Sequence, residues 1–418
     1  MNFQSKLQSL LRFSALISTF VGCCNAVWAQ PLVAPKFSTP ITYAAGGDAW
    51  YIASGALLRK GVKDIVVGNG FFGTLSLIPG NGDGTFGAPR VIFRDPTRDS
   101  VTAVAVGDFN GDGLPDIVCI VSEDVNPQVV VLLNRGKGKF SMSGKALLPF
   151  VGTSGPFERS IVVADLNGDG KLDVAVASMN QFVSVALGDG TGKLKSTTNY
   201  NAANFPAGLA VLDVDGNGTR DLALLDAQSS LPPDQEVARV TLPGLGNGQF
   251  GPPLVTSLGH NAIQVTPITL IGQDLNLDGK TDLITIYKDP VFVNGHPVFG
   301  STFVNSGNGK FVQKDLTFIP RPNLPAVPSP RGLGVGDFNH DGKMDAALTV
   351  YNPILPPSDD VYVLTGNGKG GFMAKALVFT IGLSPAALIV DDFNGDGKPD
   401  IAVALSATGV AVALNTTN

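Results

Sequence analysis

A nine-residue pattern rich in aspartate occurs six times along the 418-residue chain and strongly limits what the chain can fold into. The pattern reads D-x-[ND]-x-[DN]-G-x-x-D, and apolar residues follow each copy. We number the copies loops 1 to 6 in chain order: 108–116, 165–173, 213–221, 274–282, 337–345 and 392–400. Their first residues are separated by 57, 48, 61, 63 and 55 positions. Repetition at this period indicates an array of similar structural units.

A decayed seventh copy precedes the six loops. Asp64 aligns with the ninth position of the pattern and is followed by the same type of apolar run, but residues 53–63 lack the other acidic positions. Seven units average about 56 residues each, which is the length of one four-stranded propeller blade with its loops.

Within each unit the apolar residues have the spacing of strands. In the second unit, apolar runs at 101–106, 117–121 and 129–133 are followed by a glycine-rich turn and a fourth strand from Phe140. The 51 Gly and 29 Pro oppose a helical fold. The sequence therefore predicts an all-β fold: a seven-bladed β-propeller of four-stranded blades, spanning residues 30–418, whose first blade has no metal loop.

The two ends of the chain predict how the ring closes. After loop 6, apolar runs at 401–405 and 410–414 are followed by the end of the chain, so the last blade lacks a fourth strand. The segment 36–43 resembles the fourth strands elsewhere but precedes the first unit. We expect it to pair with 410–414, which would remove two exposed sheet edges.

The loop pattern is typical of a calcium site. Oxygen atoms at the first, third and fifth positions of a tight turn can converge on one ion, and a ninth-position carboxylate can bind through both oxygens. The sixth position is Gly in all six copies, so we expect a positive φ there and a ligand carbonyl at the seventh position. An EF-hand would need an acidic twelfth position and a following helix, whereas the twelfth residues here are Cys119, Val176, Leu224, Thr285, Leu348 and Val403.

These loops predict up to six bound Ca²⁺ ions. Loop 3 departs from the pattern, because Asn217 replaces the fifth-position Asp while Asp215 restores a third carboxylate. The predicted metal ligands are Asp108, Asn110, Asp112, Asp116, Asp165, Asn167, Asp169, Asp173, Asp213, Asp215, Asn217, Asp221, Asp274, Asn276, Asp278, Asp282, Asp337, Asn339, Asp341, Asp345, Asp392, Asn394, Asp396 and Asp400.

The loops and the strand openings Phe86-Gly-Ala-Pro89 and Phe250-Gly-Pro-Pro253 resemble the FG-GAP/VCBS repeat family, which includes the integrin α-subunit propeller. The resemblance covers roughly residues 36–418. It implies the propeller fold, calcium binding, and a role in adhesion or recognition, with catalysis on some relatives. In the family geometry the metal loops lie on one face of the disc, and ligands bind on the opposite face.

The N-terminal segment has the pattern of a secretory signal peptide. Lys6 and Arg12 precede an apolar run at 13–24, and Ala26-Val27-Trp28-Ala29 follows. We expect residues 1–29 to be removed and the protein to be secreted or held at the cell surface. An uncleaved anchor and lipid attachment at Cys23 are alternatives. Export would leave Cys119 as the sole cysteine, which excludes an intrachain disulfide.

Composition excludes some classes of partner. The net charge is −6 and no run of Lys or Arg occurs, which opposes binding to nucleic acid. The three histidines, His260, His296 and His340, belong to no catalytic or zinc motif, and at the fourth position of loop 5 we expect His340 to be solvated.

We therefore expect a monomeric binding or adhesion module for a carbohydrate or an extracellular protein. The alternative is a polysaccharide lyase or hydrolase on the same scaffold, using surface carboxylates. Long connections at 227–236, 288–300, 319–330 and 352–360 cluster on the expected ligand face. They predict a recognition patch of Lys288, His296, Arg321, Arg331 and Asp360, unless they are merely loops that a stable scaffold tolerates.

Overall fold

The computed structural model describes residues 33–96, 100–122, 127–148, 160–177, 181–204, 206–226, 238–257, 267–293, 296–316, 329–351 and 359–418. Residues 34–418 form one compact unit, and the description below concerns this unit. The predicted signal peptide, residues 1–29, lies outside the described residues.

Seven four-stranded antiparallel sheets make up the described fold, and we call their strands A to D in the order of the sheet. Blade 1 contains β2 (Ala49–Gly55), β3 (Asp64–Asn69), β4 (Thr74–Ile78) and β5 (Arg90–Arg94), with the short helix η1 (Gly70–Phe72) after β3. Blade 2 contains β6 (Ser100–Gly107), β7 (Asp116–Ser122), β8 (Gln128–Asn134) and β9 (Phe140–Leu147). Blade 3 contains β10 (Ser160–Ala164), β11 (Asp173–Ala177), β12 (Phe182–Ala186) and β13 (Thr198–Asn201). Blade 4 contains β14 (Pro206–Leu212), β15 (Asp221–Asp226), β16 (Ala238–Leu242) and β17 (Leu254–Ser257).

The remaining blades follow the same order. Blade 5 contains β18 (Pro267–Gln273), β19 (Asp282–Val293), β20 (His296–Asn305) and β21 (Phe311–Leu316). Blade 6 contains β22 (Ser329–Gly336), β23 (Asp345–Tyr351), β24 (Asp359–Gly366) and β25 (Phe372–Gly382). Blade 7 contains β26 (Pro385–Asp391), β27 (Asp400–Leu405), β28 (Gly409–Ala413) and β1 (Ile41–Tyr43).

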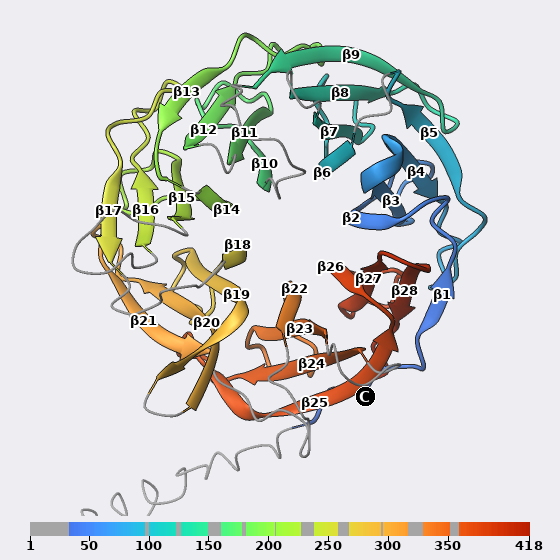
Figure 1. The fold of residues 1–418 in the computed structure, drawn as a ribbon, viewed down its shortest axis with the longest axis vertical. Coiled ribbons are helices and arrows are strands. Elements are labelled where there is room, and N and C mark those ends of the chain that lie inside the picture. Colours follow the sequence, from blue (N-terminus) through green and yellow to red (C-terminus); the bar gives the residue numbers. More distant parts are fainter. Residues whose placement is uncertain are drawn as a thin grey trace, which may run out of the picture. The chain divides into compact units, whose positions relative to one another are not determined.

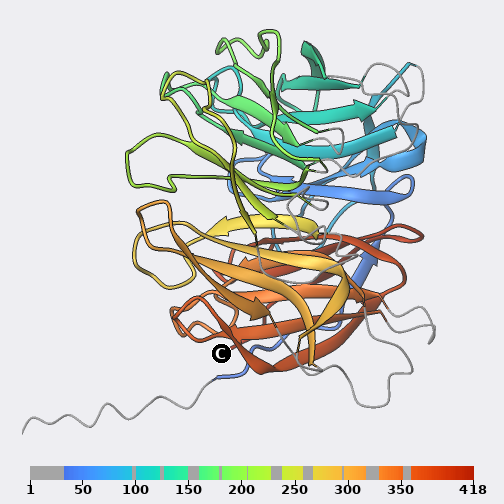
Figure 2. The ribbon, with the colours of Figure 1, turned by 60° about the vertical axis from the view of Figure 1, so that its left-hand side comes forward.

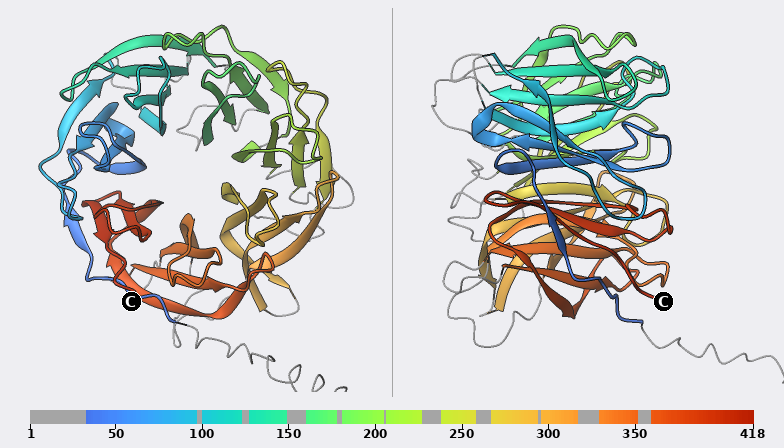
Figure 3. Two further views of the ribbon diagram at one scale, coloured as in Figure 1. Left: turned by 180° about the vertical axis from the view of Figure 1, so that it is seen from behind. Right: turned by 90° about the vertical axis from the view of Figure 1, so that its right-hand side faces the viewer.

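The sheets are arranged as a seven-bladed β-propeller, as the sequence predicts. Strand A of each blade lies nearest the centre of the ring and strand D lies at the rim (Figure 1). Each A strand leads into the loop that joins it to strand B, so the six Asp loops all follow the same end of the A strands. The other end of the A strands, where they begin, therefore belongs to the opposite face. Figures 2 and 3 show the ring from its sides and from behind.

The core lies between the blades. Strands B and C are buried on both of their faces, which explains why they read as continuous apolar runs. In the described part of the chain the buried apolar residues form seven clusters, and each cluster draws side chains from two neighbouring blades. Apolar contact between each blade and both of its neighbours is what stabilises the ring.

The predicted ring closure is confirmed. β1 pairs antiparallel with β28, with Ile41 opposite Val412 and Tyr43 opposite Val410. Figure 1 shows this N-terminal strand, in blue, as the outermost strand of the red C-terminal blade. The Phe37 ring extends the contact, because it stacks against Phe379 with ring centroids 5.1 Å apart. Closure therefore joins the two ends of the chain in one sheet and removes their free edges.

One expected loop is instead a strand pair. The sequence suggested a long connection at 288–300, whereas β19 continues to Val293 and β20 begins at His296. Val291 pairs with Val298, and Val293 pairs with His296, after an irregularity in the ladder that follows Ile286. The segment is rich in Val and Phe, residue types that favour strands, and it extends the hairpin despite its prolines. The connections at 227–236 and 352–358 and most of 319–330 lie outside the described residues.

Candidate metal loops and a central pocket

The loops are built from side chains that accept hydrogen bonds from their own backbone. In loop 2, Asp165 accepts the N–H groups of Gly168 and Gly170 at 2.7 and 2.8 Å. Asn167 Oδ1 accepts the Asp169 N–H at 2.9 Å, and Asp169 Oδ1 accepts the N–H of Lys171. These nested turns are the reason that Asp and Asn stand at alternate positions, because both side chains reach the backbone two residues ahead. They direct the side-chain oxygens of the odd positions into the turn.

Two positions of each loop require a left-handed backbone. The sixth-position glycines have φ between 79° and 84°, as the sequence predicts. The fourth position also has a positive φ in every loop, which the sequence analysis did not anticipate. Leu277 and His340 occupy it in loops 4 and 5, with φ of 64° and 58°. His340 is exposed, as expected.

The ninth-position aspartates are buried and fasten each loop to its blade. In loop 1, Asp116 accepts the Phe109 N–H at 2.9 Å through Oδ2 and the Asn134 N–H at 2.7 Å through Oδ1. The second position of the loop and the residue near the end of strand C donate in the same way to Asp173, Asp221, Asp282, Asp345 and Asp400. Each of these carboxylate oxygens therefore accepts one backbone N–H, and its remaining lone pair can meet an ion.

Burial and neighbouring carboxylates raise the pKa of these aspartates. Burial is the larger cause, and the first- and fifth-position carboxylates of the same loop add to it. The pKa reaches about 7 for Asp345 and about 6 for Asp116 and Asp400. Each loop thus gathers negative charge that a cation would offset.

The carboxylates of loop 3 lie close together. One oxygen from each of Asp213, Asp215 and Asp221 lies within 4.8 Å of the others, which is close enough for one metal ion to contact all three. This is the loop that departs from the sequence pattern, since it has Asp in the third position where the other five have Asn. An all-oxygen donor set of this kind fits a hard cation such as Ca²⁺.

In four other loops a lysine at the seventh position faces the fifth-position aspartate. The Nζ–Oδ2 distances are 3.5 Å for Lys171–Asp169, 3.2 Å for Lys280–Asp278, 3.0 Å for Lys343–Asp341 and 3.9 Å for Lys398–Asp396. These ion pairs are exposed, so water screens them and they contribute little to stability. Because these lysine side chains are long and exposed, they do not prevent a cation from binding the carboxylate.

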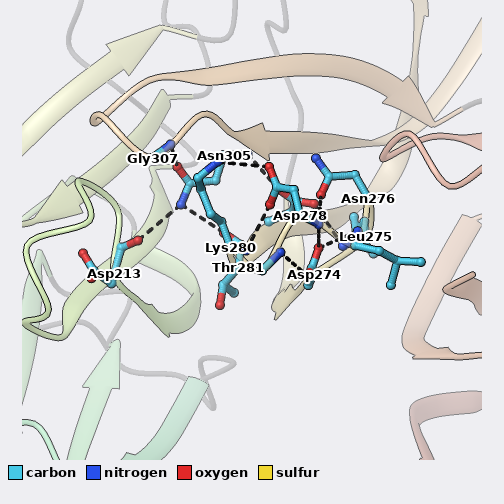
Figure 4. A network of polar contacts seen from close by, with 12 residues as sticks. Asp213, Asp274, Leu275, Asn276, Asp278, Lys280, Thr281, Asn305 and Gly307 are labelled. Atoms are coloured by element: carbon cyan, nitrogen blue, oxygen red, sulfur yellow. Dashed lines mark hydrogen bonds and ion pairs between the residues drawn. The ribbon is translucent and has the colours of Figure 1, made fainter.

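Neighbouring loops are linked through strand C. Asn305 donates its backbone N–H to Asp282 of loop 4, and its Nδ2 donates to the Asp213 carbonyl of loop 3 at 3.3 Å (Figure 4). Asn134 and Asn415 make the equivalent side-chain contacts to the carbonyls of Leu57 and Phe338. The loops of adjacent blades therefore support one another.

Blade 1 has only the buried ninth-position aspartate and its two backbone hydrogen bonds. Asp64 accepts the N–H groups of Leu58 and Gly80 at 2.8 and 3.0 Å, as the ninth-position aspartates do elsewhere. Burial raises its pKa, and the nearby Arg59 guanidinium acts in the opposite direction. The loop before it has no other carboxylate.

A pocket of about 390 Å³ opens where the A strands begin, on the face opposite the Asp loops. Its lining includes Trp50, Arg331 and Tyr351 together with four hydroxyl side chains, Ser160, Thr269, Ser384 and Ser406. The Arg331 guanidinium lies over the Tyr351 ring, 5.3 Å from its centroid. Arg331 was predicted from the sequence as a recognition residue, whereas the pocket that it lines was not predicted.

The structure does not bring the whole predicted recognition patch together. Arg331 lines the pocket, whereas Asp360 is 6% exposed in β24 and accepts a hydrogen bond from the Thr380 hydroxyl. Asp360 does not line the pocket. Lys288 and His296 lie in β19 and β20, but their side chains, like all of Arg321, are outside the described part of the structure.

Two further features bear on the sequence predictions, namely the remaining cysteine and the absence of a membrane-spanning helix among the described residues. Cys119 is a buried free thiol in β7, and burial raises its pKa to about 12. Among the described residues, no helix has the length and apolar character needed to cross a membrane.

Comparison with solved structures shows the same fold. A chain of the crystal structure of BBS1N in complex with ARL6DN, soaked with lead, matches 92% of this chain and 97% of its own length, with a TM-score of 0.55 and 10% identity. The mercury-soaked form of that complex gives a TM-score of 0.56 at 11% identity, covering 91% and 96% of the two chains. At such identities the likeness concerns the fold alone.

Comparison with known sequences identifies the repeats. The T-cell immunomodulatory protein homolog of Plasmodium falciparum (isolate 3D7) is 26% identical over 155 residues, which are 36% of this chain and 21% of that protein. The match thus spans about a fifth of that relative's length. The FG-GAP-like repeat is recognised at residues 59–119, 108–176, 165–224 and 274–348, which together make up more than half of the chain. The loops, the seven blades and these matches agree, and the chain belongs to the FG-GAP-like repeat family.

Proposed function

We propose that the protein is an exported, calcium-binding β-propeller that recognises a carbohydrate or an extracellular protein. The division of the disc carries this proposal: carboxylate loops lie at one end of the A strands and a pocket lies at the other. A scaffold stabilised on one face and open to a ligand on the other is the usual arrangement of a binding module.

Calcium would be held by the first, third, fifth and ninth positions of loops 1 to 6. In loop 3 three carboxylates lie close together, and burial and like charges raise the pKa of the ninth-position aspartates in loops 1, 5 and 6. A bound cation would offset the mutual repulsion and add binding free energy to the folded state alone. The role of the ion in this proposal is structural, since it lies on the face away from the pocket.

The relative's name supports a recognition role. A T-cell immunomodulatory protein homolog is named for an effect on cells. For this chain we propose recognition outside the cell, without transferring that partner.

Export is the part of the proposal that rests on residues 1–29. N-terminal sequencing of the protein recovered outside cells that express it would show Gln30 as the first residue after signal cleavage. A chain that begins at Cys23 and carries lipid would support the anchored form instead, and Cys23→Ser would abolish that form only. Retention of the intact chain inside the cells would contradict export.

An array of glycans and extracellular proteins tests recognition. The purified protein is applied in millimolar calcium and again after calcium removal. We expect binding to a defined ligand class in calcium and a large loss without it, because the blades hold the pocket in shape. Binding to no array member in calcium would contradict the proposal and would direct attention to polysaccharide digestion.

A further inference from the structure

A repeated irregularity in the A strands contributes residues to the pocket. In six of the seven described A strands the pairing with strand B skips one residue near the start of the strand. In β2, for example, Ala49 pairs with Asn69 and Tyr51 with Gly68, so the register skips Trp50. The skipped residues are Trp50, Thr102, Gly208, Ile268, Arg331 and Ala386. A bulge of this kind re-aims the side chain of the extra residue.

Five of these six bulge residues line the same pocket, and Thr102 is the exception. The bulges therefore direct one residue from each of five different blades toward a common space. Three of the five, Gly208, Ile268 and Ala386, supply only backbone or apolar surface. The other two, Trp50 and Arg331, are the residue types that most often anchor ligands. The ring thus places one aromatic group and one cation in a single concave site.

Among the described residues that line the pocket, Arg331 is the only charged one. Among the described residues no carboxylate forms an ion pair with it, and its guanidinium lies 5.3 Å from the centroid of the Tyr351 ring. A cation–π contact of this kind does not neutralise the charge of the guanidinium. A lone cation lining a pocket of a protein with net charge −6 selects an anionic ligand group. Its planar fork matches a carboxylate, which it can bind through two hydrogen bonds.

Trp50 is held in one position at the pocket. Its Nε1 donates to Asp48 Oδ2 at 3.1 Å, and its ring lies against Gly70, where an added Cβ would come within 2.7 Å of Cδ1. The side chain is nevertheless 37% exposed, so part of it remains open to a ligand. An exposed, fixed indole provides a flat apolar platform, and the four hydroxyl side chains of the lining provide donors and acceptors around it.

We propose that this pocket binds an acidic sugar unit, that is, a pyranose ring that bears a carboxylate. Arg331 binds the carboxylate, the Trp50 ring packs against the apolar face of the sugar, and hydroxyls of the lining meet its hydroxyls. The cavity of about 390 Å³ lies within the range of small-ligand sites and suits one or two sugar rings. This inference rests on the proposed function, because it names the ligand class of the face opposite the calcium loops.

Calorimetric titration of the calcium-loaded protein tests the proposal with two probes, D-glucuronate and D-glucose, which differ in the carboxylate. Fluorescence of Trp50 is recorded in parallel, since Trp28 belongs to the segment removed on export. We expect glucuronate to bind at least about tenfold more tightly than glucose, the factor that one charge-assisted hydrogen-bonded contact provides. We also expect glucuronate, unlike glucose at the same concentration, to change the Trp50 emission.

Three variants locate the site. Arg331→Gln should weaken glucuronate binding by about tenfold or more and leave the weak glucose binding unchanged. Arg331→Lys should recover only part of the affinity, because it keeps the charge but loses the planar fork. Arg94→Gln makes the same change of charge on the exposed outer strand β5 and should have no effect. Melting temperatures of all variants show that each one folds.

Equal affinity for the two sugars, or wild-type glucuronate binding by Arg331→Gln, would overturn the proposal. So would binding of a carboxylate-bearing peptide, such as acetyl-aspartate amide, with no binding of glucuronate. Failure of the proposed function is separate: a protein that binds an array ligand in calcium but no acidic sugar contradicts this inference alone. A protein that binds nothing on the array and no acidic sugar contradicts both.

Discussion

Blade 1 and the six blades with Asp loops differ in one connection, and the difference separates two roles of the aspartates. All seven blades have a buried Asp at the start of strand B that accepts one N–H from the preceding loop and one from the region after strand C. In blade 1 the first, third and fifth positions are Ala56, Leu58 and Lys60, which cannot form a cation site. The ninth-position carboxylate therefore has a structural role that needs no metal, whereas the carboxylates that blade 1 lacks are those that could also contact a cation.

Blade 1 has cations of its own near Asp64 and at its border with blade 7. Arg59 donates to the Gly80 carbonyl and lowers the pKa of Asp64 against the effect of burial. Lys63 forms a 2.9 Å ion pair with Asp391 of blade 7, and Ser54 donates to the same carboxylate at 2.6 Å. The blade at the junction of the ring is thus stabilised by contacts within the chain. The difference between blade 1 and the other blades is open to four experimental tests.

Removal of calcium should have the largest effect. A loop whose dissociation constant is one hundredth of the free calcium concentration stabilises the fold by about 2.7 kcal/mol, and up to six loops contribute. We expect calorimetry to show a much lower melting temperature for calcium-free protein, with recovery on adding calcium. An unchanged melting temperature would show that the loops do not depend on a metal.

Replacement of Asp64 by Ala should destabilise the protein to the same extent with and without calcium. Two buried N–H groups lose their acceptor, at a cost of about 2 to 5 kcal/mol in the free energy of unfolding. Asp116→Ala should cost more in calcium than in its absence, because it removes a metal ligand as well. Asp83→Ala, at an exposed turn, is the matched control. A calcium-dependent effect of Asp64→Ala, measured by urea unfolding, would break the comparison.

The calcium-free protein should become more stable as the pH falls from about 8 to about 5. Burial and like charges raise the pKa of Asp345 to about 7 and that of Asp116 and Asp400 to about 6, above their ordinary value of 3.8. The folded state then binds more protons than the unfolded state, so its stability is full below pH 3.8 and is lost as the pH rises through 6 to 7.

Calcium should remove or reverse this pH dependence, because the ion supplies the opposite charge and competes with protons. Melting temperatures at several pH values, with and without calcium, provide the measurement. Asp345→Asn should reduce the pH dependence of the calcium-free protein. Stability that rises with pH in calcium-free protein would contradict the charge clusters described here.

Leu277→Gly should give the smallest effect, a stabilisation of about 1 kcal/mol. Leu277 has a φ of 64° and its side chain is 55% exposed, so glycine relieves backbone strain and sacrifices little burial. The reverse change, Gly279→Ala at a φ of 84°, should destabilise the same loop by a similar amount. Urea unfolding at fixed calcium measures both, and a loss of stability in Leu277→Gly would show that the leucine packs in solution.

The repeat pattern was sufficient to predict the seven blades, their strand order and the pairing of β1 with β28. Each of these follows from local signals that recur in register, so an error in one unit is corrected by the others. The structural role of the ninth Asp was not apparent, because the sequence shows its acidic neighbours but not the N–H groups from strand C. The retention of Asp64 in the decayed copy was the one available signal.

The pocket could not be predicted in the same way. Five of its lining residues are bulge residues, and a bulge depends on which residue is skipped in the pairing with the neighbouring strand. Sequence alone does not reveal this register. Arg331 was predicted because it follows a long connection. A better signal is its position six residues before the first Asp of loop 5. Ile268 and Ala386 have the same position relative to the Asp loops of their own blades. Asp360 was predicted to be a surface residue because it adjoins a loop, but it lies within strand β24 and is buried.

The number of calcium ions bound per chain distinguishes the two roles assigned to the aspartates. Native mass spectrometry in saturating calcium should show six ions per chain, and each variant with the first-position Asp of one loop replaced by Ala should lose one. Asp64→Ala should still bind six, because blade 1 holds no ion. A protein that binds no calcium, or whose calcium content falls on replacement of Asp64, would contradict the separation of fastening and metal-binding aspartates.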